Sequence, residues 1–268
     1  MKIKPTTSAT HVGLRGYQED RFFTVSCPKG LLIGVFDGHG GQQVSHLASE
    51  KFPGIFADEI TEPKATPRTA LKKAINKLHS LTRHLNPGST LSLAYIPYRG
   101  NTVTCAILGD SPIVIKDAEG KINIGPEHNV RTNYEERRAA EERGGIVLNG
   151  YLCASFSGGG LQMARALGNY HLNRVLSRVP DIYTVKVNQD SFVIVATDGV
   201  FDPSHYNFAV AAESIVKLVE EGAEAQAIVD RAVAMPTGDN ATALVARFEG
   251  KKRAAKRRAN SRRTASGR

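Results

Sequence analysis

Acidic residues stand at the ends of strand-like runs throughout this sequence, usually beside glycine or asparagine. They are Glu19 and Asp20 before RFFTV, Asp37 after LLIGVF, Asp110 after TCAILG, Asp198 after SFVIVAT, and Asp239 before ATALVARF. A single Asp-Gly pair would be an ordinary turn. Because acidic residues recur at strand ends along the chain, we predict that these carboxylates meet at one edge of a layered fold.

Carboxylates gathered in this way would repel one another and would be costly to bury, so the pattern indicates a bound cation. A set of oxygen ligands selects Mg²⁺ or Mn²⁺ over zinc. The neighbouring glycines, such as Gly38, let the backbone approach a metal and offer a carbonyl ligand. Two such ions can activate a bridging water for in-line attack on phosphorus, which is the chemistry of phosphoester hydrolysis.

Two further residues fit this reaction. His39 follows Asp37 by two positions, where a histidine could give a proton to the leaving group. Arg15 precedes Asp20 by five positions, and its forked donors suit a substrate phosphate. Alone, they would be read as a turn histidine and a surface cation. Their place beside the acidic motifs favours the catalytic interpretation.

The pattern along the chain predicts the elements that position these residues. A helix is expected over 42–58, kinked or shortened by Pro53, and a second helix is expected with Thr66 as its cap, Pro67 in its first turn and Leu81 on its apolar face. Three later helices are predicted in TNYEERRAAEERGG, FAVAAESIVKLVEEG and EAQAIVDRAVA. The strands are predicted in RFFTVS, LLIGVF, STLSLAYI, NTVTCAILGD, PIVIKDA, KINI, YTVKV, SFVIVATDG and NATALVARFE.

The order of these elements bears on the fold class. Two helices follow one early strand and two more lie between the last two strands, while most other strands connect through turns. This segregation favours antiparallel sheets with helices packed outside them, an α+β sandwich, over a regularly alternating parallel sheet.

Composition limits the cellular setting. The 268 residues are 41% hydrophobic, yet no run is long enough to span a membrane, and MKIKPTTSAT lacks the apolar block of a secretory signal. Three widely spaced cysteines, Cys27, Cys105 and Cys153, suggest neither a disulfide framework nor a thiolate metal site. We therefore expect a core role for Cys105 and an intracellular, cytoplasmic protein, or a nuclear one if the source is eukaryotic.

The net charge of +9 comes from one segment. Residues 251–268 hold nine of the 35 Lys and Arg residues and none of the 26 acidic ones, so the rest of the chain is formally neutral. We expect a basic, disordered tail at 251–268 after a folded domain at 1–250. Such a tail could direct nuclear import or bind nucleic acid, anionic lipid or an acidic partner.

In their order and intervals, these motifs resemble the metal-dependent protein phosphatases of type 2C, which remove phosphate from serine and threonine. The resemblance runs from about residue 11 to residue 248. It rests chiefly on VFDGHGG, ATDGVFD and GDN; LGDS and ARALGN also match family elements, and RGYQED and GST would be weak alone. Together with the segregated helices, it implies a four-layer α-β-β-α sandwich of two mainly antiparallel sheets flanked by helices.

The resemblance also implies roles for single residues. Metal ligands would be Asp37, Gly38, Asp198 and Asp239, supported by Glu19 and Asp20. His39 would be the general acid and Arg15 would bind phosphate. Asp110 and Asp202 match carboxylates that hold a third metal ion in some members, and both could equally be turn or capping residues. Two Mn²⁺ or Mg²⁺ ions, with a third in some members, are the implied cofactors.

Three positions depart from the family pattern. Asn169 stands where the family usually has Asp, Ala164 where it has Ser, and Pro112 where Arg is common. They leave the ligands of the two central metals intact but bear on flap geometry, substrate preference and rate. We expect substrate selection in the segment 149–178.

Three functions remain open from the sequence. The first is an active, monomeric phosphatase acting on phosphoserine and phosphothreonine proteins. The second is a catalytically impaired family member that acts as a binding module. The third is a nucleic-acid-associated protein whose basic tail dominates its role.

Overall fold

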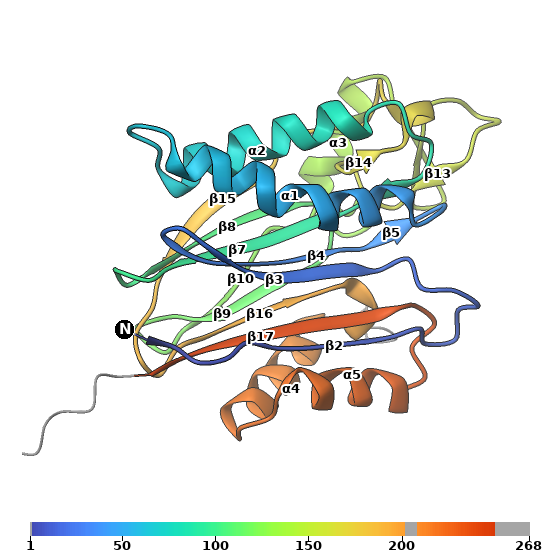
Figure 1. Cartoon of the computed structure of the whole chain (residues 1–268). Helices are drawn as coiled ribbons and strands as arrows, with labels where there is room; N and C mark the ends of the chain where they lie inside the picture. Colours follow the sequence, from blue (N-terminus) through green and yellow to red (C-terminus); the bar gives the residue numbers. More distant parts are fainter. Residues whose placement is uncertain (1, 202–207, 250–268) are drawn as a thin grey trace, which may run out of the picture.

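Two β-sheets lie face to face in the computed structural model, and helices cover their outer faces (Figure 1). The structure describes residues 2–201 and 208–249. The five-stranded sheet has the order β15-β8-β7-β4-β3, with every neighbouring pair antiparallel. Its strands are β3 (Arg21–Cys27), β4 (Gly30–Phe36), β7 (Leu91–Pro97), β8 (Thr102–Leu108) and β15 (Asp181–Lys186).

The second sheet has the order β1-β17-β16-β9-β10, and β2 also pairs with β17. Its strands are β1 (Lys2–Ile3), β2 (Thr7–His11), β9 (Ile113–Lys116), β10 (Ile122–Ile124), β16 (Phe192–Ala196) and β17 (Ala241–Glu249). All of its pairings are antiparallel. The four-layer sandwich predicted from the sequence is therefore confirmed.

Helices α1 (Gln43–Thr61) and α2 (Pro67–Thr82) pack on the outer face of the five-stranded sheet (Figure 1). Thr66 caps α2 as predicted, because its hydroxyl accepts a hydrogen bond from the Thr69 backbone N–H. The expected shortening at Pro53 is wrong, since α1 continues two turns beyond it. Leu81 is 44% exposed and does not belong to the apolar face.

Helices α4 (Phe208–Glu220) and α5 (Ala225–Ala234) cover the other sheet. Three apolar cores result, one under each helix pair and one between the sheets, the last including Ile33, Cys105 and Leu244. Because the central strands are covered on both sides, β4 is buried at every position and reads as an uninterrupted apolar run. No helix among residues 2–201 and 208–249 is long and apolar enough to cross a membrane.

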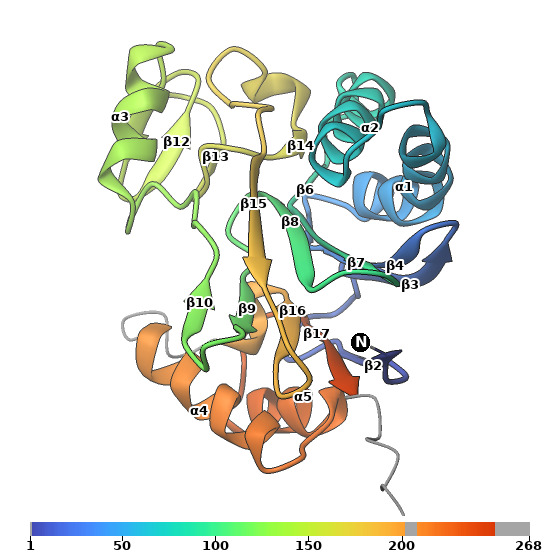
Figure 2. The ribbon, with the colours of Figure 1, turned by 90° about the vertical axis from the view of Figure 1, so that its left-hand side faces the viewer.

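A smaller unit projects beside the sandwich at one end (Figure 2). It contains α3 (Tyr134–Glu142) and the antiparallel strands β11 (Ile146–Leu148), β12 (Tyr151–Cys153) and β13 (Gly160–Leu161) around a fourth apolar cluster. Asn133 caps α3 by accepting hydrogen bonds from two backbone N–H groups, and Gly144 follows the end of the helix in a left-handed conformation. The helix lies in the stretch TNYEERRAAEERGG, where the sequence predicts one.

A three-stranded sheet joins motifs that are far apart in the sequence. It consists of β5 (Gly38–His39), β6 (Gly88–Ser89) and β14 (Leu167–Gly168), in the order β14-β6-β5. Its strands come from VFDGHGG, GST and ARALGN. This sheet fixes the position of His39 relative to the segment that carries Asn169. Two short 3₁₀ turns, Tyr170–Leu172 and Asp198–Val200, complete the regular structure of the described residues.

Candidate functional site

Strand ends from both large sheets meet around one cavity of about 320 Å³. Asp37 follows β4 and Asp110 follows β8 in the five-stranded sheet, while Asp198 follows β16 and Asp239 precedes β17 in the other. The lining residues are Arg15, Tyr17, Glu19, Asp37, Gly38, His39, Gly40, Asp110, Tyr151, Gly160, Leu161, Gln162, Met163, Asp198 and Asp239. The predicted convergence of the carboxylates therefore occurs.

The backbone of Asp37 is fixed by Thr90. The Asp37 N–H donates to Thr90 Oγ1 at 3.1 Å, and the Thr90 N–H donates to the Asp37 carbonyl at 2.9 Å. Thr90 is held in turn by a 2.7 Å hydrogen bond between its hydroxyl and that of Ser111. These contacts explain why GST and LGDS accompany the acidic motif: they position the strand end that carries Asp37.

Gly38 is needed for space. A Cβ atom at this position would lie 2.5 Å from the carbonyl oxygen of Glu19 and 2.6 Å from Ser45 Oγ. The Ser45 hydroxyl donates to that same Glu19 carbonyl, and the Glu19 carboxylate accepts a hydrogen bond from the Gly41 N–H. Glu19 therefore contacts the DGHGG turn directly, as a supporting residue would.

His39 is held by Asn169, a contact that the sequence did not reveal. The His39 ring Nε2 donates to the side-chain oxygen of Asn169 at 2.9 Å, while Nδ1 is buried without a hydrogen-bond partner. Asn169 has a left-handed backbone with φ of 52°. Burial lowers the pKa of His39, and the hydrogen bond to Asn169 partly opposes that effect. Gly88 leaves room for the pair.

Asp37 is surrounded by four other carboxylates of the site. Burial, followed by the charges of Asp198, Asp20, Asp239 and Asp110, raises the pKa of Asp37 well above its usual range. A carboxyl group in such surroundings is driven to take up a proton or to bind a cation. Its surroundings therefore match those expected of a central metal ligand.

Asp20 is buried and is not part of the cavity lining, whereas Asp110 is a buried residue that lines it. Burial raises the pKa of Asp20 to about 7, although its carboxylate accepts hydrogen bonds from the hydroxyls of Thr197 at 2.9 Å and Thr242 at 2.7 Å. Burial raises the pKa of Asp110 to about 8, and Asn129 donates to one of its oxygens at 2.9 Å. The two threonine hydroxyls therefore fix the Asp20 carboxylate in place, and Asn129 positions the Asp110 carboxylate.

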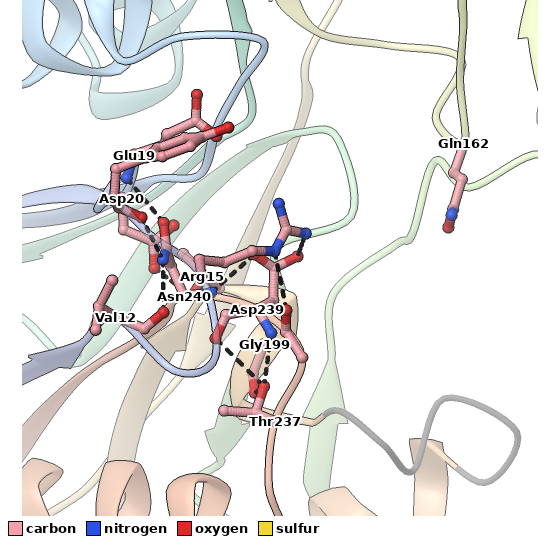
Figure 3. Close-up of polar contacts among 12 residues, drawn as sticks. Val12, Arg15, Glu19, Asp20, Gln162, Gly199, Thr237, Asp239 and Asn240 are labelled. Carbon is pink, nitrogen blue, oxygen red and sulfur yellow. Dashed lines mark hydrogen bonds and ion pairs between the residues drawn. The ribbon is translucent and has the colours of Figure 1, made fainter.

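Arg15 and Asp239 form an ion pair across the cavity rim (Figure 3). Arg15 Nη2 donates to the Asp239 carboxylate at 2.8 Å, and Nε donates to the Gly238 carbonyl at 2.9 Å. The Arg15 side chain remains 45% exposed. Its other guanidinium donors are available to a phosphate, so this geometry is compatible with the predicted role.

Asn240 ties the N-terminal motif to the end of the chain. Its side-chain oxygen accepts from the Glu19 N–H at 2.8 Å, and its amide donates to the carbonyls of Val12 at 2.9 Å and Tyr17 at 3.0 Å (Figure 3). This contact explains the asparagine of the GDN motif. It holds RGYQED beside Asp239 across more than 220 residues of sequence.

The donor set fits a hard divalent cation. One carboxylate oxygen of Asp198 and one of Asp110 are buried without a hydrogen-bond partner in the described residues. Such oxygens are costly unless a cation or water meets them. Within residues 2–201 and 208–249, no three His, Cys, Asp or Glu side chains are arranged to hold one ion by themselves. Backbone carbonyls or water must therefore complete the coordination of an ion here, as Mg²⁺ commonly requires.

The described structure brings together all but one of the predicted site residues. Asp202, predicted as a ligand of a third ion, lies outside the described residues. Tyr151 and Gln162 also line the cavity, and the sequence singled out only the segment 149–178 that contains them, as a region for substrate selection. Figure 3 shows Gln162 apart from Arg15 and Asp239, on a different segment of the chain.

Known proteins are similar to this chain in sequence and in fold. A family model described as Protein phosphatase 2C matches residues 25–241. Probable protein phosphatase 2C 52 of Oryza sativa subsp. japonica is 31% identical over 230 residues, 81% of this chain and 44% of the relative. Probable protein phosphatase 2C 69 of Arabidopsis thaliana is 31% identical over 260 residues, covering 92% of this chain and 70% of the relative. The chain spans about half the length of the first two curated relatives.

Solved structures agree on the fold. A serine-threonine phosphatase 2C from Toxoplasma gondii superposes with a TM-score of 0.69 at 24% identity, covering 91% of this chain and 94% of that one. The catalytic domain of the serine threonine protein phosphatase PstP, in complex with two manganese ions, gives 0.63 at 19% identity, covering 92% and 99%. These likenesses show the sandwich architecture.

Proposed function

Because the chain belongs to the protein phosphatase 2C family, we propose that it is a metal-dependent protein phosphatase acting on phosphoserine and phosphothreonine. The main structural support for this proposal is the cavity in which Asp37, Asp198 and Asp239 converge from both sheets. The preference for serine and threonine is drawn from the family alone.

We propose that Asp37, Gly38, Asp198 and Asp239 hold two Mn²⁺ or Mg²⁺ ions, supported by Glu19 and Asp20, and that Asp110 contributes to a third. The unpartnered carboxylate oxygens and the charge-driven pKa shift of Asp37 support this assignment. When bound, the ions would supply acidified water for in-line attack on phosphorus.

The other side chains would act on the substrate. Arg15 stands at the rim with free donors, where it can orient the phosphate after Asp239 has fixed its guanidinium plane. His39 lies two residues beyond Asp37, and Asn169 orients its ring, so it can give a proton to the leaving serine or threonine oxygen. Burial lowers the pKa of His39, and the negative charge of a bound phosphate would raise that pKa and favour the protonated ring.

The test is release of phosphate from a phosphothreonine peptide, with Mn²⁺ and with EDTA, by the chain and by Asp37→Asn. We expect metal-dependent turnover that falls at least a hundredfold in the variant while the thermal unfolding midpoint in EDTA does not fall. Asp230→Asn, an exposed carboxylate on α5, is the matched control and should keep full activity. No turnover by the folded, metal-loaded chain would refute the proposal and favour a binding module.

The remaining assignments are also proposals. We propose a catalytic domain at 1–250 and a basic tail at 251–268 that brings the enzyme to nucleic acid or acidic partners inside the cell, with phosphoproteins as substrates. Nine basic residues without an acidic one support the tail's role. Deletion of 251–268 should lower affinity for DNA or acidic protein in a salt-dependent way and leave peptide turnover unchanged; unchanged affinity would refute it.

A further inference from the structure

A second groove, of about 680 Å³, lies where the two sheets present their edges on the same side of the sandwich. β15 is the edge of the five-stranded sheet and β10 is the edge of the other, and Figure 2 shows both strands on the side that faces the viewer. Residues 179–185 and 123–126 line it, together with Arg68 and Lys72 from α2. Gly125 brings the two edges close, since a Cβ there would lie 2.5 Å from the Tyr183 hydroxyl.

The backbone of β15 offers unpaired hydrogen-bonding groups to this groove. The Ile182 carbonyl accepts from the Arg68 guanidinium, and the Lys186 carbonyl accepts from the Ala118 N–H at 2.9 Å, so both point away from β8. Because backbone groups alternate along a strand, those of Thr184 must point the same way. Within residues 2–201 and 208–249, β15 has no strand partner on that side, so Thr184 presents one donor and one acceptor.

The charge of the groove is positive. Arg68 and Lys72 stand four residues apart on one face of α2, and both side chains are exposed. The groove's acidic residue, Asp181, is neutralised by Arg165 at 3.4 Å and contacts His128 at 3.0 Å. Ile124 and Val179, 41% and 63% exposed, add apolar surface. An extended ligand with acidic and apolar side chains would match both the positive charge and the apolar surface of the groove.

His128 connects the groove to the segment that leads into the catalytic cavity. His128 contacts Asp181 in the groove through Nε2, and its Nδ1 accepts a hydrogen bond from the Gly109 N–H at 3.0 Å. Gly109 immediately precedes Asp110 in the cavity. A peptide bound along β15 would therefore lie near the end of the sheet where the carboxylates meet.

We propose that the β15 edge binds an extended acidic segment of a partner protein as an added strand. The backbone of that segment pairs with Thr184, and its acidic side chains face Arg68 and Lys72. The partner is the phosphoprotein substrate, a point that rests on the proposed phosphatase function. Main-chain pairing supplies affinity, and the basic pair selects for acidic sequence.

The experiment titrates Asp37→Asn protein in EDTA with a fluorescein-labelled peptide, Glu-Val-Glu-Val-Glu-Val-Glu-Val, and follows anisotropy at low salt. We expect saturable binding that weakens at least tenfold in the double variant Arg68→Ala/Lys72→Ala. The charge-matched control Lys51→Ala/Lys217→Ala removes two exposed lysines from α1 and α4 and should change the Kd less than twofold. A peptide with Lys for Glu should not bind.

A second comparison tests the strand pairing. Thr184→Pro removes an outward N–H without breaking the ladder to β8, so it should abolish binding, whereas Thr184→Ala should bind normally. The peptide N-methylated at alternate residues should also fail. No binding of the acidic peptide at millimolar concentration, or an unchanged Kd in the Arg68→Ala/Lys72→Ala variant, would overturn the proposal. Either result would leave the phosphatase test untouched, because neither metal nor turnover enters this measurement.

Discussion

His39 is oriented by an amide, where a carboxylate is usual in the family, and this changes the charge balance of the ring. The Asn169 oxygen accepts a hydrogen bond from Nε2–H but carries no full negative charge, while burial disfavours the charged imidazolium form of the ring. The departure at Asn169 therefore bears on the proton donor itself. It does not disturb the carboxylates around Asp37.

Asn169→Asp should raise the pKa of His39, because a carboxylate beside the ring stabilises its charged form. The measurement is an NMR titration of the His39 ring in the metal-free protein. Asn101→Asp, on the loop between β7 and β8, adds the same charge at an exposed site and should leave the pKa of His39 unchanged. An unchanged His39 pKa in Asn169→Asp would show that the contact does not govern it.

Gly88→Ala should lower turnover roughly tenfold or more by disturbing this contact. An added Cβ would lie 1.9 Å from the Asn169 side-chain oxygen and 2.3 Å from His39 Nε2, so the pair must separate. The measurement is kcat on the phosphothreonine peptide. Gly159→Ala is the control, since a Cβ there meets nothing within 4 Å. Full activity in Gly88→Ala would contradict the orienting role of Asn169.

The sequence predicted the site residues correctly where each lies in a recognisable motif at the end of an apolar strand. Asp37, Asp198 and Asp239 were singled out because each ends or begins an apolar strand, and the structure brings them together. The contact of His39 with Asn169 was not predictable, because 130 residues separate them and a left-handed turn aims the amide. The ion pair of Arg15 with Asp239 joins residues 224 positions apart, and the sequence did not predict it either.

At the scale of elements, apolar patterning predicted the principal strands and helices. Tertiary packing determined where some of them end, which patterning could not predict. Pro53 was expected to kink or shorten α1, yet the helix runs to Thr61 because Phe52, Phe56 and Ile60 bury a continuous face against the sheet. Burial of that face outweighs the backbone hydrogen bond that proline removes. The short strands β5, β6 and β14 have two residues each, too few for a period to be visible.

Gly54→Ala should stabilise the protein by about 0.5–1 kcal/mol. Gly54 lies inside α1, is exposed, and a Cβ there would meet no atom within 4 Å, so alanine gains helix propensity without a clash. The measurement is the free energy of unfolding in urea. Gly144→Ala is the contrasting variant: space is open there too, but φ of 89° makes alanine strained and destabilising. A loss of stability in Gly54→Ala would indicate that Pro53 distorts the helix there.

At the scale of the molecule, one buried histidine links the sandwich to the unit beside it. His128 accepts from Gly109 through Nδ1 and donates to Asp181 through Nε2, and its carbonyl accepts from the Ala164 N–H at 2.8 Å. Burial lowers the pKa of His128, although Asp181 opposes the shift. Protonation would place a second donor against the Gly109 N–H, so the folded state requires the neutral ring.

The stability that neutral His128 contributes should therefore decrease as the pH falls below about 6.5. The unfolded chain takes up a proton at the ordinary histidine pKa, whereas folded His128 resists until a lower pH, so the unfolded state binds more protons between those two values. The measurement is the free energy of unfolding at pH 7.5 and pH 5 for the chain and for His128→Gln. The variant should be less stable at pH 7.5 and should lose less on acidification. An equal loss in both proteins would contradict this role.

The pairing of β1 with β17 has a topological consequence. Lys2 lies opposite Glu249, and their side chains form a 3.7 Å ion pair, so the two ends of the described body are neighbours (Figure 1). β17 runs nine residues from Ala241 beside the cavity to Glu249, roughly 30 Å for an extended strand. A short linker could therefore close the backbone into a ring there, and the ring could be reopened at Gly100. Such a circular permutant would keep the catalytic constellation, while a reporter fused at either original end would stand clear of it.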